Sequence, residues 1–375
     1  MSPSRRKHRI LHTLGWVSSG GVEQRRLMLA RTLPCDRYEH LVICQDSGGA
    51  LPDLLRAEGR PVHEVGLALH ILSPAWHRRA YDIARAFQPD LIHGAVIEGV
   101  ALANGIGLRM PGVRVISEET SDPVNRSWRG NLLMRGMCLR SDVVIGVSPQ
   151  VGTYLRDTAR IPARKIRVID NAVSPAPEIG TAELQRLRSG LGLAEGDIVI
   201  GSVGRVLDSH KRFSDLIRAA GLLRKQGLAA KLLIVGDGPD RATLETLAAD
   251  LGLTGTVIFA GYQGKARRFY PLMDLFVLAS AHEAFGLVLV EALLAGVPVV
   301  ATRVGGIPYV LDEGKAGVLV PPYAPGALAE AIGTLLRDDS TRKMLAVGGR
   351  QRAEQTFSAD RYCRELDALY QGLVR

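Results

Sequence analysis

Short apolar segments alternate with amphipathic helical patterns along nearly all of the 375 residues, and this alternation restricts the fold more than any other feature. Such alternation is typical of parallel sheets that carry helices on both faces. In the first half of the chain the predicted strands are 10–14, 41–44, 62–65, 91–93, 113–117 and 143–147. The helices between them are predicted at 22–33, 76–87, 96–108 and 132–139.

A second series of the same kind follows, with predicted strands at 198–203, 232–235, 257–259, 275–278, 297–301 and 318–320. A chain of this length exceeds one typical hydrophobic core. We therefore expect an α/β protein with two doubly wound Rossmann-like domains whose carboxyl-end crevices face each other across a cleft.

The expected domains are residues 1–172 and 196–356, joined by a linker region at 173–195. Pro175 and Pro177 interrupt the alternating pattern and place the linker there. The last helix, within 357–375, is long enough to pack back on the first domain.

The net charge of +9 is unevenly distributed. Residues 1–190 carry 26 Lys and Arg against 18 Asp and Glu, whereas the remainder is nearly neutral. A basic half indicates an anionic partner. Nucleic acid is not expected, because the basic residues are not interleaved with aromatics and no nucleic-acid motif is present. An anionic membrane surface fits better, although an arginine-rich background composition explains the charge equally well. The candidate contacts are 5–9 and four arginines around the apolar stretch 132–137: Arg126, Arg129, Arg135 and Arg140.

The sequence also predicts a compartment. No apolar run is long enough to span a membrane, and 9–17 is expected to form a first strand instead of a signal peptide. The four cysteines, which lack metal-ligand spacing, are expected to be buried thiols of a cytoplasmic protein: Cys35, Cys44, Cys138 and Cys363.

Two glutamates eight positions apart bracket a junction between a buried strand and a helix. Glu283 precedes Gly286, and Glu291 lies about one turn inside the helix that follows. Free amides and the helix dipole at such a junction favour a phosphate. Carboxylates beside it would repel the anion unless they point at neutral hydroxyls, which suits a nucleotide sugar. An ordinary amphipathic helix with two solvated glutamates is the alternative.

Other residues that suit phosphate lie after predicted strands. Arg205 follows Gly204 at the end of the first strand of the second series, and Lys211 lies in the next loop. Both point towards a ligand crevice in such a sheet, unless they are surface loop charges. Gly236 opens a tight turn that is also common without a ligand.

A glycine pair follows the first strand of the chain. Gly20 and Gly21 leave amides free for a phosphate, unless they form a helix start capped by Ser19.

These motifs occur in a fixed order, and together they resemble the retaining glycosyltransferases of family 4, which have the two-domain GT-B architecture. The resemblance extends over nearly the whole chain and is strongest from about 198 to 322. The resemblance implies that Glu291 holds the ribose and that Glu283 contacts the transferred sugar. It also implies that side chains and amides of the second domain hold the diphosphate: Arg205, Lys211, Gly236, Phe285, Gly286 and Leu287. The glycine pair of the first domain, Gly20 and Gly21, is implied to close over the donor phosphate.

The implied activity moves a hexose from a nucleotide sugar, with UDP as the family expectation, to a hydroxyl of a glycan or lipid-linked acceptor. Such enzymes retain the anomeric configuration, and stabilising the leaving phosphate matters more than a strong base. No metal and no cofactor are expected. The implied process is synthesis of polysaccharide or cell-envelope glycan, with the protein peripheral on the inner face of the plasma membrane.

One position departs from the family pattern. Many relatives carry two histidines spaced by one residue after the fourth strand, the second near the sugar. Here His93 is followed by Gly94 and Ala95. His93 is therefore a candidate catalytic residue or a structural histidine, and the missing contact is expected from Glu98 or from the pair Glu118 and Glu119.

The departure motivates an alternative, a non-catalytic member that binds a nucleotide sugar and regulates a partner. A Rossmann oxidoreductase is disfavoured because no strand is followed by the three-glycine dinucleotide fingerprint. An epimerase or a phosphorylase on the same architecture stays open.

Overall fold

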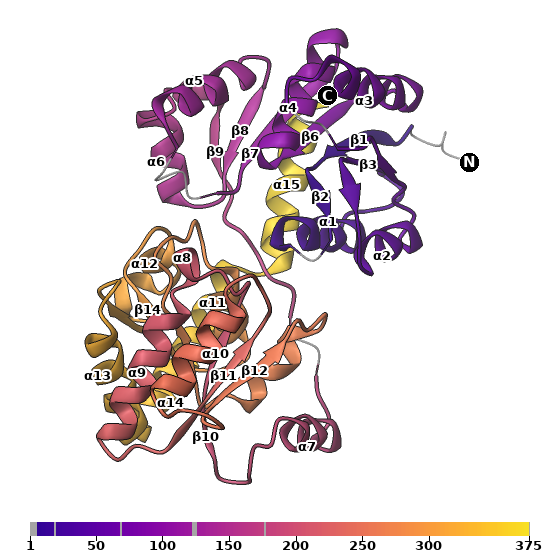
Figure 1. Ribbon diagram of the computed structural model, residues 1–375. Coiled ribbons are helices and arrows are strands. Elements are labelled where there is room, and N and C mark those ends of the chain that lie inside the picture. Colours follow the sequence, from indigo (N-terminus) through magenta and orange to yellow (C-terminus); the bar gives the residue numbers. More distant parts are fainter. Residues whose placement is uncertain (1–5, 19, 68–69, 122–125, 176–177, 375) are drawn as a thin grey trace. The chain divides into compact units, whose positions relative to one another are not determined.

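The computed structural model describes residues 6–18, 20–67, 70–121, 126–175 and 178–374. It divides into two compact units, each described here by itself (Figure 1). Unit 1 comprises Met1–Ala172 and Ala359–Arg375, and unit 2 comprises Val173–Ser358. Arg5, Ser19 and Pro177, which enter the sequence predictions, lie outside the described residues.

A parallel sheet of seven strands forms the centre of unit 1, in the order β5-β3-β1-β6-β7-β8-β9. The strands of unit 1, which include a separate two-stranded pair of β2 and β4, are β1 His8–Thr13, β2 Trp16–Val17, β3 Tyr38–Cys44, β4 Asp46–Ser47, β5 Val62–Glu64, β6 Leu91–Ala95, β7 Arg114–Glu119, β8 Val143–Gly146 and β9 Ile166–Val168.

Helices cover this sheet, and the last of them comes from the far end of the chain. In Figure 1 the yellow helix α15 lies with the indigo and purple elements of unit 1. Its Tyr362, Leu366 and Tyr370 pack in the same apolar layer as Ile10 and Leu91 of the sheet. The helices of unit 1 are α1 Gly21–Thr32, α2 Leu51–Ala57, α3 Pro74–Phe87, α4 Val96–Arg109, α5 Trp128–Met137, α6 Pro149–Asp157, the 3-10 turn η1 Ala163–Lys165 and α15 Ala359–Leu373.

Unit 2 contains a parallel sheet of six strands in the order β12-β11-β10-β13-β14-β15. Alternate residues of each strand enter opposite apolar layers: on β13, Phe276 and Leu278 face one layer and Leu275 and Val277 the other. Burial on both faces explains why these strands read as continuous apolar runs. The strands are β10 Ile198–Val203, β11 Ala230–Val235, β12 Val257–Gly261, β13 Leu275–Leu278, β14 Val299–Thr302 and β15 Val318–Val320.

The helices of unit 2 lie on both faces of this sheet. They are α7 Thr181–Gly190, α8 Asp208–Lys211, α9 Phe213–Lys225, α10 Arg241–Asp250, α11 Leu287–Leu294, α12 Ile307–Val310, α13 Pro325–Arg337, α14 Asp339–Thr356 and the 3-10 turns η2 Ala266–Leu272 and η3 Asp312–Gly314. Helix α7 lies within the stretch predicted as a linker. Its Leu184 and Leu187 pack against the apolar layer of unit 2, so this stretch is more structured than its prolines indicated.

The predicted fold class, two doubly wound parallel sheets, is confirmed by these topologies. Strand β9 was not predicted, because three residues of which two are exposed give no apolar run. Within the described ranges, none of the helices is long and apolar enough to cross a bilayer. All four cysteines are free thiols, and Cys35 is exposed, contrary to the expectation that all four are buried.

Candidate functional site

The strand order of unit 2 locates a ligand crevice. Strand β10 lies beside β13. Helix α9, which follows β10, packs in one apolar layer, whereas α11, which follows β13, packs in the other. The chain therefore leaves the two neighbouring carboxyl ends in opposite directions, which opens a crevice at the place where ligands bind in such sheets.

Lys211 and Glu283 meet at this crevice. The ammonium of Lys211 donates to Oε2 of Glu283 at 2.5 Å. The loops that carry them are joined, because the amide of Ala281 donates to the carbonyl of His210 at 2.8 Å. The two side chains remain 20% and 16% exposed. A cation and a carboxylate are thus held together and stay open to solvent.

Arg205 adds a second cation to the same rim. It is exposed, and its guanidinium forms no ion pair within the described ranges. The preceding Gly204 packs against Lys211, since a Cβ at this glycine would lie 3.6 Å from Cε of the lysine. Gly236, with φ of 143°, comes so close to the same turn that an added Cβ would lie 1.9 Å from the Gly204 carbonyl oxygen. Only glycine permits this approach.

Helix α11 points its amino terminus at this region. Gly286 precedes the helix with φ of 92°, a left-handed conformation that favours glycine. Among the described contacts, no side chain caps the helix. No acceptor among the described residues is found for the amides of Phe285, Gly286 and Leu287, and unpaired amides at a helix start favour an anion. The amide of Gly306 donates to the carbonyl of Glu283 at 2.9 Å and fixes the loop before the helix.

Glu291 lies on α11 and contacts two residues of η2. Its carboxylate accepts from Nε of Arg267 at 3.1 Å and from the hydroxyl of Tyr270 at 2.9 Å. Tyr270 is fully buried, whereas the Glu291 side chain is 21% exposed. The two donors hold the carboxylate in one orientation with one side open. Sequence reasoning missed both partners, because η2 carries no recognisable motif.

In unit 1, Gly20 and Gly21 begin helix α1. Gly20 is the residue before the helix, and among the residues that the structure describes no side chain caps the helix start. The carboxylate of Glu23 lies over Gly20, close enough that a Cβ there would meet its Oε2 at 2.2 Å. Burial raises the pKa of Glu23. An acidic group already lies at this helix start, so a phosphate there would have to displace it.

His93, on strand β6 of unit 1, lies in a sealed cluster. It is 0% exposed; its Nδ1 lies 2.7 Å from the hydroxyl of Tyr370, and its Nε2 lies 3.1 Å from Glu118. Glu118, 1% exposed, also accepts from Arg25 at 2.5 Å and from Arg26 at 2.7 Å. Burial lowers the pKa of His93 to about 4, which keeps the ring neutral. This position favours the structural role for His93 over contact with a sugar, and it removes Glu118 as a substitute.

Glu119 and Glu98, the other two candidates for the contact of the missing histidine, have different surroundings. Glu119 accepts from Arg126 at 2.6 Å and from Ser121. Glu98 lies at the start of α4, beside Gly15, with no hydrogen bond or ion pair to other described residues. Val96, two residues before it, has φ of 57°, which is strained for a β-branched residue. Glu98 is thus the open carboxylate at the end of β6.

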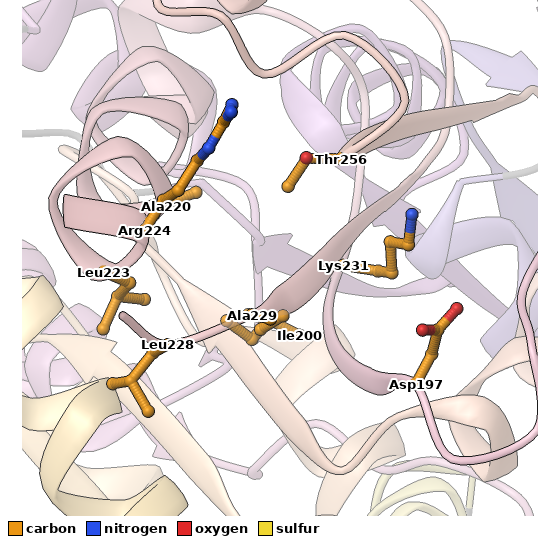
Figure 2. A pocket seen from close by; sticks show the side chains of 10 residues that line it. Asp197, Ile200, Ala220, Leu223, Arg224, Leu228, Ala229, Lys231 and Thr256 are labelled. Carbon is orange, nitrogen blue, oxygen red and sulfur yellow. The ribbon is translucent and has the colours of Figure 1, made fainter. Parts of the chain in front are cut away.

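Unit 2 also has a small cavity at the amino-terminal ends of its strands, away from the crevice at their carboxyl ends. Its volume is about 180 Å³, and Asp197 and Lys231 line it (Figure 2). Both residues lie at the amino-terminal ends of β10 and β11. Ligand crevices of doubly wound sheets lie at the carboxyl ends, so we assign no chemistry to this cavity. No cluster of metal-ligating side chains occurs in the part of the chain that the structure describes.

Comparison with known proteins identifies the family. The model "Glycosyl transferases group 1" matches residues 185–352, and the model "Glycosyltransferase Family 4" matches residues 19–176. A lipopolysaccharide core biosynthesis glycosyltransferase, LpsE of Rhizobium meliloti, is 35% identical over 59% of this chain and 61% of its own length. N-acetyl-alpha-D-glucosaminyl L-malate synthase of Bacillus anthracis is 28% identical over 65% of this chain and 63% of its own. The chain thus spans about three fifths of these relatives.

Solved structures agree on the fold. Anabaena Alr3699/HepE, in complex with UDP-glucose, aligns with a TM-score of 0.85 and 24% identity over 97% of this chain and 99% of its own. WaaG, a glycosyltransferase involved in lipopolysaccharide biosynthesis, aligns with a TM-score of 0.75 and 17% identity over 96% and 99%. The two family models together cover most of the chain, and the sheets have the topology that the fold requires. The chain therefore belongs to glycosyltransferase family 4 and has the GT-B fold.

Proposed function

We propose that the protein transfers a hexose from a nucleotide sugar to a hydroxyl of a glycan or lipid-linked acceptor, with retention of anomeric configuration. The observation that carries this proposal is the open pairing of Lys211 with Glu283 at the crevice of unit 2. It combines one group suited to a phosphate with one suited to sugar hydroxyls, and Arg205 and the free amides of α11 lie on the same rim.

The donor would lie with its diphosphate against Arg205, Lys211 and the start of α11. Lys211 has three N–H donors, and Glu283 accepts from one of them. The remaining two are available to phosphate oxygens. Glu283 would accept from hydroxyls of the transferred sugar, and Glu291, held by Tyr270, would accept from the ribose.

The reaction breaks the bond between the anomeric carbon and the phosphate oxygen and forms a bond to the acceptor oxygen. Negative charge develops on the departing phosphate, where fixed cations and free amides stabilise it most in the transition state. The acceptor proton would pass to a departing phosphate oxygen on the same face. Because Lys211 and Arg205 supply the positive charge, we propose that no divalent metal is needed.

Relatives guide the choice of substrates. Anabaena HepE is solved with UDP-glucose, which supports a UDP-sugar as the donor. LpsE of Rhizobium meliloti acts in lipopolysaccharide core biosynthesis, which supports an acceptor of the cell envelope. The free cysteines are compatible with the reducing cytoplasm, where we propose that the protein works.

The test incubates the protein with UDP-, GDP- and ADP-hexoses, each with a membrane lipid extract or a glycan fraction, in the presence and absence of EDTA. We expect nucleotide release with one UDP-hexose, unchanged by EDTA, and an α-linked product by NMR. Absence of both transfer and slow donor hydrolysis with every nucleotide sugar would contradict the enzyme proposal.

Ala95 favours a second candidate, a non-catalytic member that binds a nucleotide sugar and regulates a partner. If Glu98 supplies the polar contact that Ala95 cannot make, the protein can remain catalytic despite the missing histidine. Binding of a UDP-hexose without hydrolysis, in wild type and in Glu98→Gln alike, would support the second candidate. A turnover that falls in Glu98→Gln would support the enzyme.

A further inference from the structure

A wide apolar groove lies on the surface of unit 1, and none of the residues assigned above to donor binding lines it. Its volume is about 760 Å³, within the range of ~300–1,000 Å³ that ligand sites have. Helices α4 and α5 pack against each other and form much of its wall. Small residues, Ala101 and Gly105 on α4 and Gly136 on α5, line the groove and give it depth.

Helix α5 is apolar on its outer side as well as on its inner side. Met134 and Met137 are buried and face the unit. Trp128 is 71% exposed and Leu132 is 60% exposed. A surface helix of a soluble domain normally presents polar residues to water. Here the outer residues continue into the groove, and Leu108 of α4 extends the apolar surface with 72% exposure.

The rim of this surface is positively charged. Arg109 and Arg129 line the groove, and Arg135 lies on α5 beside it. None of the three forms an ion pair with a described residue; Arg129 lies over the Trp128 ring at 5.3 Å instead. No Asp or Glu is among the described residues that line the groove. Exposed Trp and Leu beside unpaired arginines are the composition of a membrane-surface helix.

We propose that this face, Leu108, Trp128, Leu132, Leu133 and Leu139 with Arg109, Arg129 and Arg135, docks on an anionic lipid bilayer, and that the groove receives a hydrocarbon chain from it. The arginines contact lipid phosphates while the apolar side chains enter the headgroup and acyl boundary. Charge complementarity selects this occupant. A second copy of the chain would bring two positively charged rims together, which costs binding energy. Docking needs no donor and is independent of the proposed transfer reaction.

The apolar contribution is tested by flotation of the full chain with phosphatidylcholine vesicles, with and without phosphatidylglycerol. We expect binding to the anionic vesicles and little to the neutral ones. Leu132→Ser with Leu133→Ser should reduce the bound fraction severalfold. The matched control, Met344→Ser with Val347→Ser, removes two exposed apolar side chains from unit 2 and should bind as the wild type does.

The charge contribution is tested by Arg129→Gln with Arg135→Gln. Losing two arginines near an anionic surface should lower the partition coefficient into anionic vesicles by roughly tenfold or more. Added salt should lower the partition coefficient of the wild type as well, because it screens the attraction. Arg85→Gln with Arg364→Gln removes the same charge from exposed positions outside the groove and should have a smaller effect. Trp128 fluorescence should shift to shorter wavelength on docking, and a Trp128→Phe variant should lose that shift.

Three results would overturn the proposal. The first is no binding to anionic vesicles at low salt, and the second is equal binding of the Leu132→Ser, Leu133→Ser variant. The third is a dimer of the wild type in sedimentation that this variant loses, which would assign the face to a second copy. All five substituted residues of this face are exposed, so the variants are expected to keep the fold, and circular dichroism of each variant verifies it.

Discussion

Both units contain a glutamate paired with basic side chains, but the surroundings of the two glutamates are opposite. In unit 1, Glu118 is 1% exposed and is surrounded by Arg25, Arg26 and His93. In unit 2, Glu283 is 16% exposed, and Lys211 is its one ion-pair partner among the described residues. Similar residue types therefore serve two purposes. A sealed cluster has no room for a ligand and is costly to break, because removing one partner leaves buried charge uncompensated. An open pair with spare donors can bind a ligand.

The largest effect is expected from Glu118→Ala. The substitution leaves the guanidinium groups of Arg25 and Arg26 buried without their carboxylate, which costs about 3–5 kcal/mol of unfolding free energy. Urea denaturation measures it. Glu283→Ala is the matched control, because breaking a partly exposed pair costs only about 0–1 kcal/mol. Equal losses in the two variants would contradict the distinction between a sealed and an open cluster.

Lys211→Ala should act on turnover instead of on stability. Removing one fixed donor from a developing anion lowers kcat/KM by roughly 10²–10³-fold. Steady-state kinetics with the preferred nucleotide sugar measures the loss. Lys231→Ala is the control. This lysine lines the small cavity of Figure 2 and lies at the amino-terminal end of β11, so its loss should leave kcat/KM unchanged.

The sealed cluster also predicts a dependence of stability on pH. Burial lowers the pKa of His93 to about 4, and the coulombic effect of Arg26 adds to the shift. The unfolded histidine takes up a proton near a pKa of about 6.5, so between the two values the unfolded state binds more protons. Stability is therefore full above about pH 6.5 and falls as the pH decreases towards 4, by ~3 kcal/mol for this group. Urea denaturation at a series of pH values gives the unfolding free energy as a function of pH. This free energy should change less steeply with pH in His93→Gln than in the wild type, and an equally steep change would contradict a buried, neutral His93.

The smallest effect is expected from Tyr270→Phe. The variant loses the hydroxyl that donates to Glu291 at 2.9 Å, a bond worth ~1 kcal/mol. If Glu291 holds the ribose, KM for the donor should rise about fivefold while kcat changes little. Initial rates at varied donor concentration separate the two constants. A fall in kcat with constant KM would place Glu291 nearer the reacting carbon.

Local pattern explains why much of the fold was predictable. Strands such as Leu275–Leu278 are continuous apolar runs because both of their faces are buried. Lys211 and Glu283 were expected in one site because both follow predicted strands and because the order of motifs resembles family 4. That their strands, β10 and β13, are neighbours was learned from the structure. The contact of His93 with Tyr370 was not predictable from local pattern, since it joins positions 277 apart. Arg267 and Tyr270 were missed for the same reason: their role comes from packing against α11 and not from a motif.

The central claim is that the open cluster of unit 2 binds the diphosphate of a nucleotide sugar. Isothermal titration of UDP into the protein in EDTA tests it most directly, with wild type compared with Arg205→Ala and Lys211→Ala. Hydrogen bonds to charged groups contribute about 1.5–3 kcal/mol each, so each variant should bind UDP at least tenfold more weakly. Equal affinity in all three proteins, or no UDP binding by the wild type, would contradict the account.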